Sequence, residues 1–279
     1  MSDPLPPVAE TPSRNLLLRT VAALILAPLT LLLAWLGDWA WLALVAVVSI
    51  GLFVEWQTLV GHAQSRLMMA AGAMALLAAA ICLGLGADAM AGLALILGIA
   101  AAAGLSGRRQ GWAALGALYA SIALGASILL RRDPAEGFVA LMLVLLVVWV
   151  TDILGYFCGR GIGGPKLWVR VSPKKTWAGA LGGLAGSFAV AGIFAGLELG
   201  RGWPLLALAG GLSVVSQLGD LFESAVKRHF GVKDSSHIIP GHGGLLDRLD
   251  GFVAAVACAA LIGWLRGGID GMGRGLMVW

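Results

Sequence analysis

The chain has 279 residues, of which 59% are hydrophobic and 12% charged, and its formal net charge is +4. Ordinary soluble domains are about 45–50% apolar and about 25% charged, so this composition excludes a soluble domain, a disordered chain and a nucleic-acid-binding protein. The three cysteines lie within apolar runs and lack paired or metal-ligand spacing, which predicts free packing residues and no disulfide. The composition indicates a polytopic membrane protein.

The apolar runs predict an all-α protein with about nine transmembrane helices. Residues 1–15 are rich in proline and lack an apolar period, so we expect a flexible cytoplasmic tail. A membrane-spanning helix needs about 20 mainly apolar residues. Runs of about this length cover residues 16–36, 39–60, 67–86, 89–105, 112–130, 138–158, 176–197, 203–222 and 246–265. We therefore expect N-terminal membrane spans over 16–137 and a C-terminal membrane region over 138–279.

The basic residues predict the orientation of these spans. When alternate loops are assigned to the two sides, one side receives 14 of the 19 Lys and Arg residues and the other receives 5. The positive-inside rule then places the N-terminus in the cytoplasm and the C-terminus outside. The two most polar loops, 159–175 and 227–245, share the cytoplasmic side. On the seventh run, Gly179 with Gly183 and Gly182 with Gly186 form small-xxx-small patterns that predict close helix packing.

Carboxylates flank or enter the apolar runs of the C-terminal half: Asp152, Asp220, Glu223, Asp247 and Asp250. A charge at membrane depth costs several kcal/mol unless it is paired, so such residues are functional candidates. Glu55 is a solitary carboxylate in the second run. It is either a carboxylate near a helix end that reaches the membrane interface or a functional group. Both interpretations stay open.

The densest polar segment runs from Gln217 to Gly251. On a helix, Asp220, Ser224 and Lys227 share one face, Glu223 and Lys227 have ion-pair spacing, and Asp247 and Asp250 share another face. Carboxylates gathered in this way would repel one another unless a cation lay between them, and Mg²⁺ takes oxygen ligands of this kind. The glycines between these helices let backbone amides approach an anion.

The second polar segment is Ser172-Pro173-Lys174-Lys175-Thr176, directly before the seventh run. Paired lysines at a helix N-terminus suit a polyphosphate by charge and by exposed amides. A basic loop next to a membrane span can also serve topology alone, and this alternative stays open for the segment by itself.

These residues resemble a known family. The stretch from Ser224 to Asp250 resembles the signature of phosphatidate cytidylyltransferases, with its fixed positions filled by Ser224, Lys227, Arg228, Lys233, Asp234, Pro240, His242, Gly243, Gly244, Asp247, Arg248 and Asp250. The segments Gln217–Asp220, Ser172–Trp177 and Asp152–Arg160 are also similar to that family. One departure is Ala178, where the family pattern has Glu, so an acidic role at that position is dispensable here.

The resemblance implies an integral membrane enzyme of phospholipid biosynthesis. Such an enzyme transfers CMP from CTP to phosphatidate, giving CDP-diacylglycerol and pyrophosphate. The resemblance also implies Mg²⁺, a second, monovalent cation such as K⁺, and a homodimer in the bacterial inner membrane with its active site on the cytoplasmic face. Residues 138–279 then form the catalytic region.

The expected roles follow from charge and chemistry. Asp220, Asp247 and Asp250 are expected to hold the metal, and Lys227, Arg228, Lys233 and Arg248 to bind phosphates. Lys174 and Lys175 are expected to bind the polyphosphate or the lipid headgroup, and His242 a phosphate or the leaving pyrophosphate. The remaining expected substrate-binding residues are Asp152, Tyr156, Ser172, Thr176, Ser224, Gly243 and Gly244.

Two other functions fit part of the pattern. A CTP-dependent lipid kinase of the polyprenol type would also span the membrane and use a metal, but it would release CDP. A transporter with buried acids would bind a coupling cation near the bilayer midplane, on interrupted helices. The charges of this chain gather at helix ends on the predicted cytoplasmic side, which favours chemistry on a soluble nucleotide.

Overall fold

The computed structural model describes residues 12–63, 65–236 and 243–279 of the chain. Its helices in chain order are α1 (Pro12–Leu36), α2 (Asp38–Leu59), α3 (Arg66–Gly84), α4 (Asp88–Leu105), α5 (Gln110–Arg132), α6 (Gly137–Gly161), α7 (Trp177–Gly196), α8 (Gly202–His229), α9 (Leu246–Gly267) and α10 (Met272–Met277). A short 3-10 turn, Gly107–Arg109, precedes α5. The all-α prediction is confirmed. Of the predicted tail, residues 1–11 lie outside the described residues, and residues 12–15 belong to α1.

Each predicted apolar run coincides with one long helix. The helices α2 to α9 are long and apolar enough to cross a membrane. The described apolar part of α1 covers Leu24–Leu36 alone, so its role as a ninth span stays a prediction. The largest difference in length is at α8, which continues to His229, seven residues beyond the predicted end at residue 222. Its last turns contain Glu223 and Lys227, whose charges ended the apolar run in the sequence.

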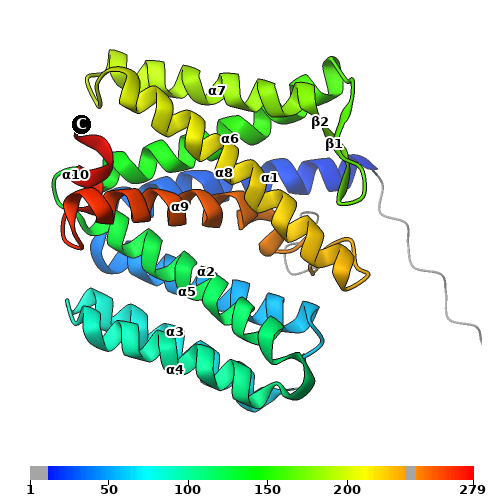
Figure 1. Ribbon diagram of the computed structural model, residues 1–279, viewed down its shortest axis with the longest axis vertical. Coiled ribbons are helices and arrows are strands. Elements are labelled where there is room, and N and C mark those ends of the chain that lie inside the picture. Colours follow the sequence, from blue (N-terminus) through cyan, green and yellow to red (C-terminus); the bar gives the residue numbers. More distant parts are fainter. Residues whose placement is uncertain (1–11, 64, 237–242) are drawn as a thin grey trace, which may run out of the picture.

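The helices lie side by side, with the hairpin of α3 and α4 along one edge and α7 along the opposite edge (Figure 1). Sequential neighbours form the closest pairs, notably α6 with α7, α3 with α4 and α8 with α9. The predicted glycine packing is confirmed. A Cβ atom on Gly179 would lie 2.7 Å from the carbonyl oxygen of Gly155, and one on Gly183 would lie 2.8 Å from that of Thr151. The lack of side chains at these glycines therefore lets α6 and α7 touch through their backbones.

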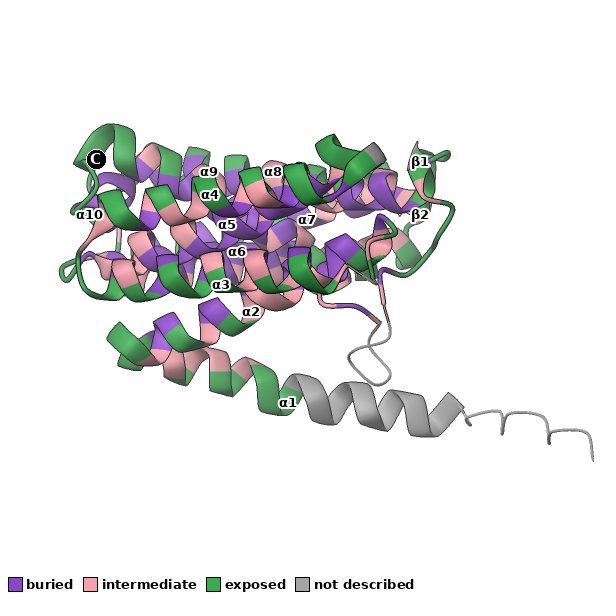
Figure 2. Ribbon diagram, turned by 90° about the horizontal axis from the view of Figure 1, so that it is seen from below, coloured by how far each residue is buried: buried purple, intermediate pink, exposed green. Residues whose placement is uncertain are grey.

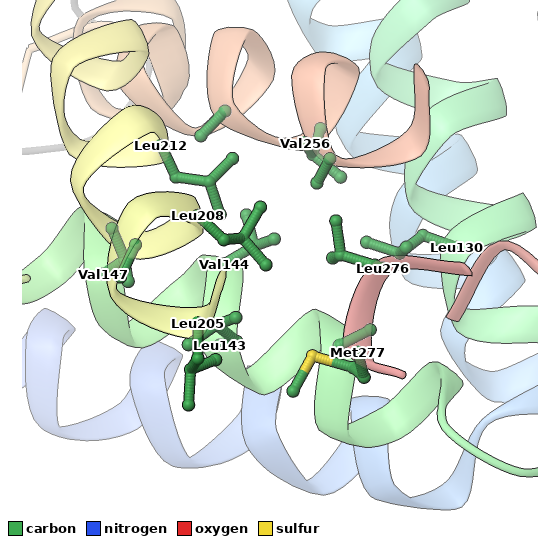
Figure 3. Close-up of a cluster of buried hydrophobic side chains, with 14 of the residues drawn as sticks. Leu130, Leu143, Val144, Val147, Leu205, Leu208, Leu212, Val256, Leu276 and Met277 are labelled. Atoms are coloured by element: carbon green, nitrogen blue, oxygen red, sulfur yellow. The ribbon is translucent and has the colours of Figure 1, made fainter. Parts of the chain in front are cut away.

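Two large apolar clusters hold the bundle together. One joins helices α5 through α10 (Figure 3), with Leu130, Leu143, Val144, Val147, Leu205, Leu208, Leu212, Val256, Leu276 and Met277 among its members. The other joins α2, α3, α4 and α5, with further members from α1 and α6. A third, smaller cluster includes Leu52, Trp56, Val226 and Leu246, and it packs α2 against the polar ends of α8 and α9. Through this cluster the N-terminal half of the bundle contacts the C-terminal half.

The outer faces of the bundle are apolar. Large apolar side chains are exposed along α1, α3 and α4 (Figure 2), for example Leu26, Leu77 and Ile96. Such faces are typical of helices that contact lipid, because in hydrocarbon a helix satisfies its backbone hydrogen bonds internally and presents only side chains. The three cysteines are free, as predicted.

One short piece of sheet interrupts the helical pattern. Strands β1 (Lys166–Trp168) and β2 (Ser172–Thr176) pair antiparallel between α6 and α7, with Lys166 opposite Thr176. This hairpin lies at the end of the bundle where α8 ends and α9 begins, and the C-terminus lies at the other end (Figure 1). The two predicted polar loops therefore share one end of the bundle, which we call the polar end.

The end of the bundle opposite the polar end contains ion pairs that connect its loops and helices. Arg132 pairs with Asp88 at 2.6 Å and with Asp270 at 3.2 Å. At the polar end, the guanidinium of Arg109 lies 5.4 Å from the ring centroid of Phe230. These contacts agree with the predicted partition of basic residues between two ends. Which end faces the cytoplasm stays a prediction.

The short helix α10 is tied to the bundle by Asp133, whose side chain is fully buried. The backbone amide of Arg274 donates to Asp133 Oδ2 at 2.7 Å, and that of Ala135 donates to Oδ1 at 2.9 Å. Burial alone would raise the pKa of Asp133, but hydrogen bonds from the amides of Arg274, Ala135 and Glu136 outweigh it and lower the pKa. Asp133 therefore connects α5, α6 and α10 as a carboxylate.

Candidate active site

The hairpin β1–β2 presents a lysine to helix α8. Thr176 ends the hairpin and caps α7, since its hydroxyl accepts a hydrogen bond from the amide of Gly179 at 3.1 Å. This cap is typical of a helix start, where backbone N–H groups lack partners within the helix. The preceding residue, Lys175, forms an ion pair with Asp220 of α8. The cap thus fixes the position from which Lys175 reaches α8.

The end of α8 has the side-chain pattern that its spacing predicts. Ser224 Oγ lies 3.4 Å from Asp220 Oδ1, one turn away. Lys227 Nζ lies 2.6 Å from Glu223 Oε2, which confirms the predicted ion pair. Both members of this pair are almost fully buried. The polar end of α8 therefore faces other helices of the bundle.

Helices α8 and α9 touch through their backbones at Gly219. A Cβ atom on Gly219 would lie 2.6 Å from the carbonyl oxygen of Asp250 and 2.6 Å from Cβ of Ala254. Real Cβ atoms do not approach other atoms so closely, so only glycine permits this contact. The contact places Asp220, the next residue of α8, beside Asp250 of α9.

Three carboxylates gather there, and we call them the acidic group: Asp152 of α6, Asp220 of α8 and Asp250 of α9. Asp250 is repelled by Asp220 and Asp152, and Asp152 is repelled by Asp220. Lys175 attracts all three, and Arg248 attracts Asp152. Negative charge exceeds positive charge in this group, so it favours a further cation.

A second cluster is centred on Lys227, and we call it the Lys227 network. Asp247 Oδ1 lies 2.5 Å from Lys227 Nζ, opposite the ion pair with Glu223. Asp247 Oδ2 accepts hydrogen bonds from the amides of Ser235 at 3.2 Å and Gly244 at 3.0 Å. One lysine therefore bridges α8 and α9, and Asp247 also contacts Ser235 and Gly244, which lie between these helices.

The two aspartates of α9 thus have different partners, although their spacing predicts one shared role. Both oxygens of Asp247 are engaged by Lys227 and by the loop, whereas Asp250 faces Asp220 and Asp152. Lys227 is likewise engaged by two carboxylates. Exposed basic residues at this end, such as Lys174 and Lys233, are the candidates for contact with an anion.

Other expected site residues lie around these two clusters. Lys174, Arg228, Lys233 and Arg248 are exposed, and Ser172 is half-buried. Arg228 donates to the carbonyl of Val232 at 2.8 Å, and the hydroxyl of Tyr156, which is exposed, lies 3.2 Å from Arg160. Gly243 adopts a left-handed backbone with φ of 83°. His242 lies outside the described residues, so its expected role stays a prediction.

The structure adds two residues that the sequence patterns did not single out, Tyr119 and Ser235, and gives partners to a third, Glu55. The hydroxyl of Tyr119 in α5 is buried, has no hydrogen-bond partner among the described residues, and lies within electrostatic range of Asp250 and Glu223. Ser235 contacts Asp247 by its amide and its hydroxyl. Glu55, whose role the sequence leaves open, is 1% exposed and contacts Ser235. Tyr119 and Glu55 both come from the N-terminal half, far from the signature: the sequence marks Glu55 as a solitary carboxylate without indicating its partners, and nothing in the local spacing indicates Tyr119.

The donor chemistry of the acidic group fits Mg²⁺, a hard cation that takes oxygen ligands. Among the described residues, no three acidic, histidine or cysteine side chains are arranged to hold a metal ion by themselves. Mg²⁺ is usually bound by one or two carboxylates, with waters and substrate phosphates completing the shell. The acidic group can supply that smaller number of ligands.

The Gly219 contact gives a prediction for stability. Gly219→Ala is expected to lower the free energy of unfolding by about 1–3 kcal/mol, the usual cost of overpacking. Gly211→Ala on the same helix is the matched control, because a Cβ atom there meets open space. Thermal unfolding of the detergent-purified variants measures the difference. Equal melting temperatures for the two variants would contradict the contact.

The fold and the site together define a polytopic membrane protein with clustered carboxylates and bases at one end of its helices. A profile of the cytidylyltransferase family matches residues 17–265, which is most of the chain. The chain belongs to the cytidylyltransferase family.

Relatives share this similarity over nearly their whole length or over about half of it. A phosphatidate cytidylyltransferase of Brucella abortus is 42% identical over 259 residues, covering 89% of this chain and 93% of the relative. One of Pseudomonas aeruginosa is 40% identical over 266 residues, covering 89% of this chain and 97% of the relative. One of Bacillus subtilis is 42% identical over 148 residues, covering 51% of this chain and 54% of the relative.

Proposed function

We propose that this protein transfers CMP from CTP to phosphatidate, giving CDP-diacylglycerol and pyrophosphate for phospholipid biosynthesis. The observation that carries the proposal is the meeting of Asp152, Asp220 and Asp250 with Lys175 at one end of the bundle. With a cation bound to these carboxylates, such a site suits two anionic substrates, one from the membrane and one from water. The similarity to phosphatidate cytidylyltransferases supports the choice of substrates.

The reaction needs no protein nucleophile. A phosphate oxygen of phosphatidate attacks the α-phosphorus of CTP, a new P–O bond forms, and the bond between the α-phosphorus and the bridging oxygen breaks. Pyrophosphate leaves with that oxygen and its electron pair. The protein must align two anions and balance the developing charge, which is the usual basis of catalysis in phosphoryl transfer.

The side chains divide this work. We assign Mg²⁺ to Asp220 and Asp250 of the acidic group, where it would neutralise phosphate charge as a Lewis acid. Lys174, Lys175, Arg228, Lys233 and Arg248 bind phosphates of the nucleotide and the lipid. The Lys227 network holds the ends of α8 and α9 in register, and through Asp247 it fixes the loop between them. A second, monovalent cation such as K⁺ remains part of the proposal and is tested by exchanging K⁺ for Na⁺ in the assay.

Labelled CTP tests the reaction. With label at the α-phosphate, radioactivity should enter the lipid fraction only when phosphatidate and Mg²⁺ are both present. With label at the γ-phosphate, it should appear in pyrophosphate and never in lipid. Dolichol-type and undecaprenol-type alcohols in place of phosphatidate serve as the control substrates.

Two outcomes would reject the proposal. Transfer of γ-label into lipid would favour the CTP-dependent lipid kinase, which attacks the γ-phosphorus and releases CDP. Cation-dependent uptake into vesicles, with no label in lipid, would favour the transporter. The clusters lie at helix ends, and a coupled transporter is expected to bind its ions near the bilayer midplane.

We also propose that the protein acts as a homodimer in the inner membrane, with the N-terminus and the polar end in the cytoplasm and the C-terminus outside. The 14 to 5 partition of basic residues supports the sidedness. Val169 in the hairpin and Val278 at the opposite end are exposed and suit labelling. In a cysteine-free background, Val169→Cys and Val278→Cys should react with an impermeant maleimide from opposite sides of the membrane. Reaction of both from one side would contradict the nine-span topology.

A further inference from the structure

Glu55 connects the N-terminal half of the bundle to the candidate active site. It lies near the end of α2 and is 1% exposed. Its Oε2 accepts a hydrogen bond at 2.9 Å from the amide of Leu246, the first residue of α9. Its Oε1 lies 2.7 Å from Ser235 Oγ. The carboxylate therefore holds two segments that are 180 and 191 residues away in the sequence.

Ser235 lies between Glu55 and Asp247. Its hydroxyl oxygen is 2.7 Å from Glu55 Oε1 and 3.0 Å from Asp247 Oδ2, and its amide also donates to Asp247. The backbone of Gly244 passes directly over the same group, since a Cβ atom there would collide with Glu55 Oε1 and Ser235 Oγ. Ser235 and Leu246, which hydrogen-bond to Glu55, both border Asp247, Ser235 by contact and Leu246 as its neighbour in the chain.

We propose that Glu55 is a positioning residue for the transfer reaction. Through Leu246 it fixes the start of α9, and through Ser235 it fixes a residue that holds Asp247 beside Lys227. This inference rests on the proposed function only where CMP transfer is measured. Its structural part concerns the order of segment 243–250 without any ligand.

The chemistry of this contact distinguishes two substitutions. Glu55→Gln keeps one oxygen to accept from Leu246 and gains an amide group that can donate to Ser235 Oγ, so Ser235 can donate its own proton to Asp247. Glu55→Ala removes both contacts. If hydrogen bonding is the function of Glu55, the Gln variant should resemble the wild type and the Ala variant should not.

Two residues of α2 provide matched controls. Gln57 is fully buried and donates to the carbonyl of Ala113 at 2.8 Å, away from the loop. Gln57→Ala therefore removes a buried hydrogen bond of the same helix without touching the site. Ser49 is also fully buried, and its hydroxyl has no hydrogen-bond partner among the described residues. Ser49→Ala therefore tests the loss of a buried polar atom that makes no hydrogen bond to the described part of the chain.

The first measurement is amide hydrogen exchange of segment 243–250 in detergent, without metal or substrate. Glu55→Ala should exchange about tenfold faster there, the effect of about one lost hydrogen bond. Glu55→Gln, Gln57→Ala and Ser49→Ala should match the wild type in this segment. Equal exchange in Glu55→Ala and wild type would overturn the proposal, whether or not the protein transfers CMP.

The second measurement is the rate of CMP transfer. Glu55→Ala should lower kcat by about 100-fold with little change in KM for CTP, because a misplacement of about 1 Å in a catalytic group costs about that factor. Glu55→Gln should restore most of the rate. If Glu55→Ala does not fold, Ser235→Ala removes the same bridge from the loop side and should lower kcat in the same direction. An equal loss in Gln57→Ala, or in Glu55→Gln, would contradict positioning by hydrogen bonds.

Discussion

Asp250→Asn is expected to lower the rate of CMP transfer by about 100-fold or more at fixed Mg²⁺ while leaving membrane insertion unchanged. The amide keeps the shape of the carboxylate but removes its charge. A bound metal stabilises transition-state charge by several kcal/mol, and each 1.36 kcal/mol is worth about a factor of ten in rate. Initial rates with labelled CTP in detergent micelles measure the loss, and a Mg²⁺ titration should show a higher requirement.

Asp270→Asn is the matched control for this substitution. Asp270 is an exposed aspartate at the opposite end, where it contacts Arg132 at 3.2 Å. The same chemical change there should leave the rate within about twofold, because exposed ion pairs contribute little. Near wild-type turnover in Asp250→Asn would reject Asp250 as a metal ligand.

Lys227→Met is expected to lower the free energy of unfolding by about 3–5 kcal/mol and to abolish activity. The substitution leaves the buried Glu223 and the half-buried Asp247 without their shared cation, and removing one partner of a buried pair typically costs about that much. Methionine matches the length of the lysine stem, so packing changes little. Thermal unfolding of the purified protein in detergent measures the effect.

Lys174→Met provides the comparison on an exposed lysine at the same end. Its effect on unfolding should stay within about 0.5 kcal/mol, while its rate should fall if it binds phosphate. Adding Glu223→Gln to Lys227→Met should recover part of the lost stability, because one uncompensated charge is then removed. A double variant no more stable than Lys227→Met would show that the network does not act by charge balance.

The helices follow from hydropathy because lipid tolerates only segments that satisfy their own backbone hydrogen bonds. Two features of the polar end could not be predicted in this way. The charged end of α8 is helical because Glu223 and Lys227 are paired inside the bundle. A helix boundary predicted from hydropathy falls before these two charged residues, so it comes too early. The hairpin β1–β2 has no apolar alternation, so its sequence resembles an ordinary basic loop.

The residue types of the site follow from the local pattern, but their partners do not. The spacing of Asp247 and Asp250 predicts one face of a helix and therefore one role. The contact of Gly219 with Asp250 sets the register between α8 and α9, and this register gives the two aspartates different neighbours. Glu55 and Tyr119 reach the site from helices that are distant in sequence, and a single chain carries no signal for such contacts.

The contact between Gly219 and Asp250 also has a mechanical meaning. When two rods rock about the point where they touch, displacement grows with distance from that pivot. The start of α8 at Gly202 is 17 residues from Gly219, or about 26 Å at about 1.5 Å per residue. A tilt of about 5° would move that end by about 2 Å and the backbone of Asp220 by only about 0.1 Å. Bilayer fluctuations that bend the bundle therefore leave the separation of Asp220 and Asp250 almost constant.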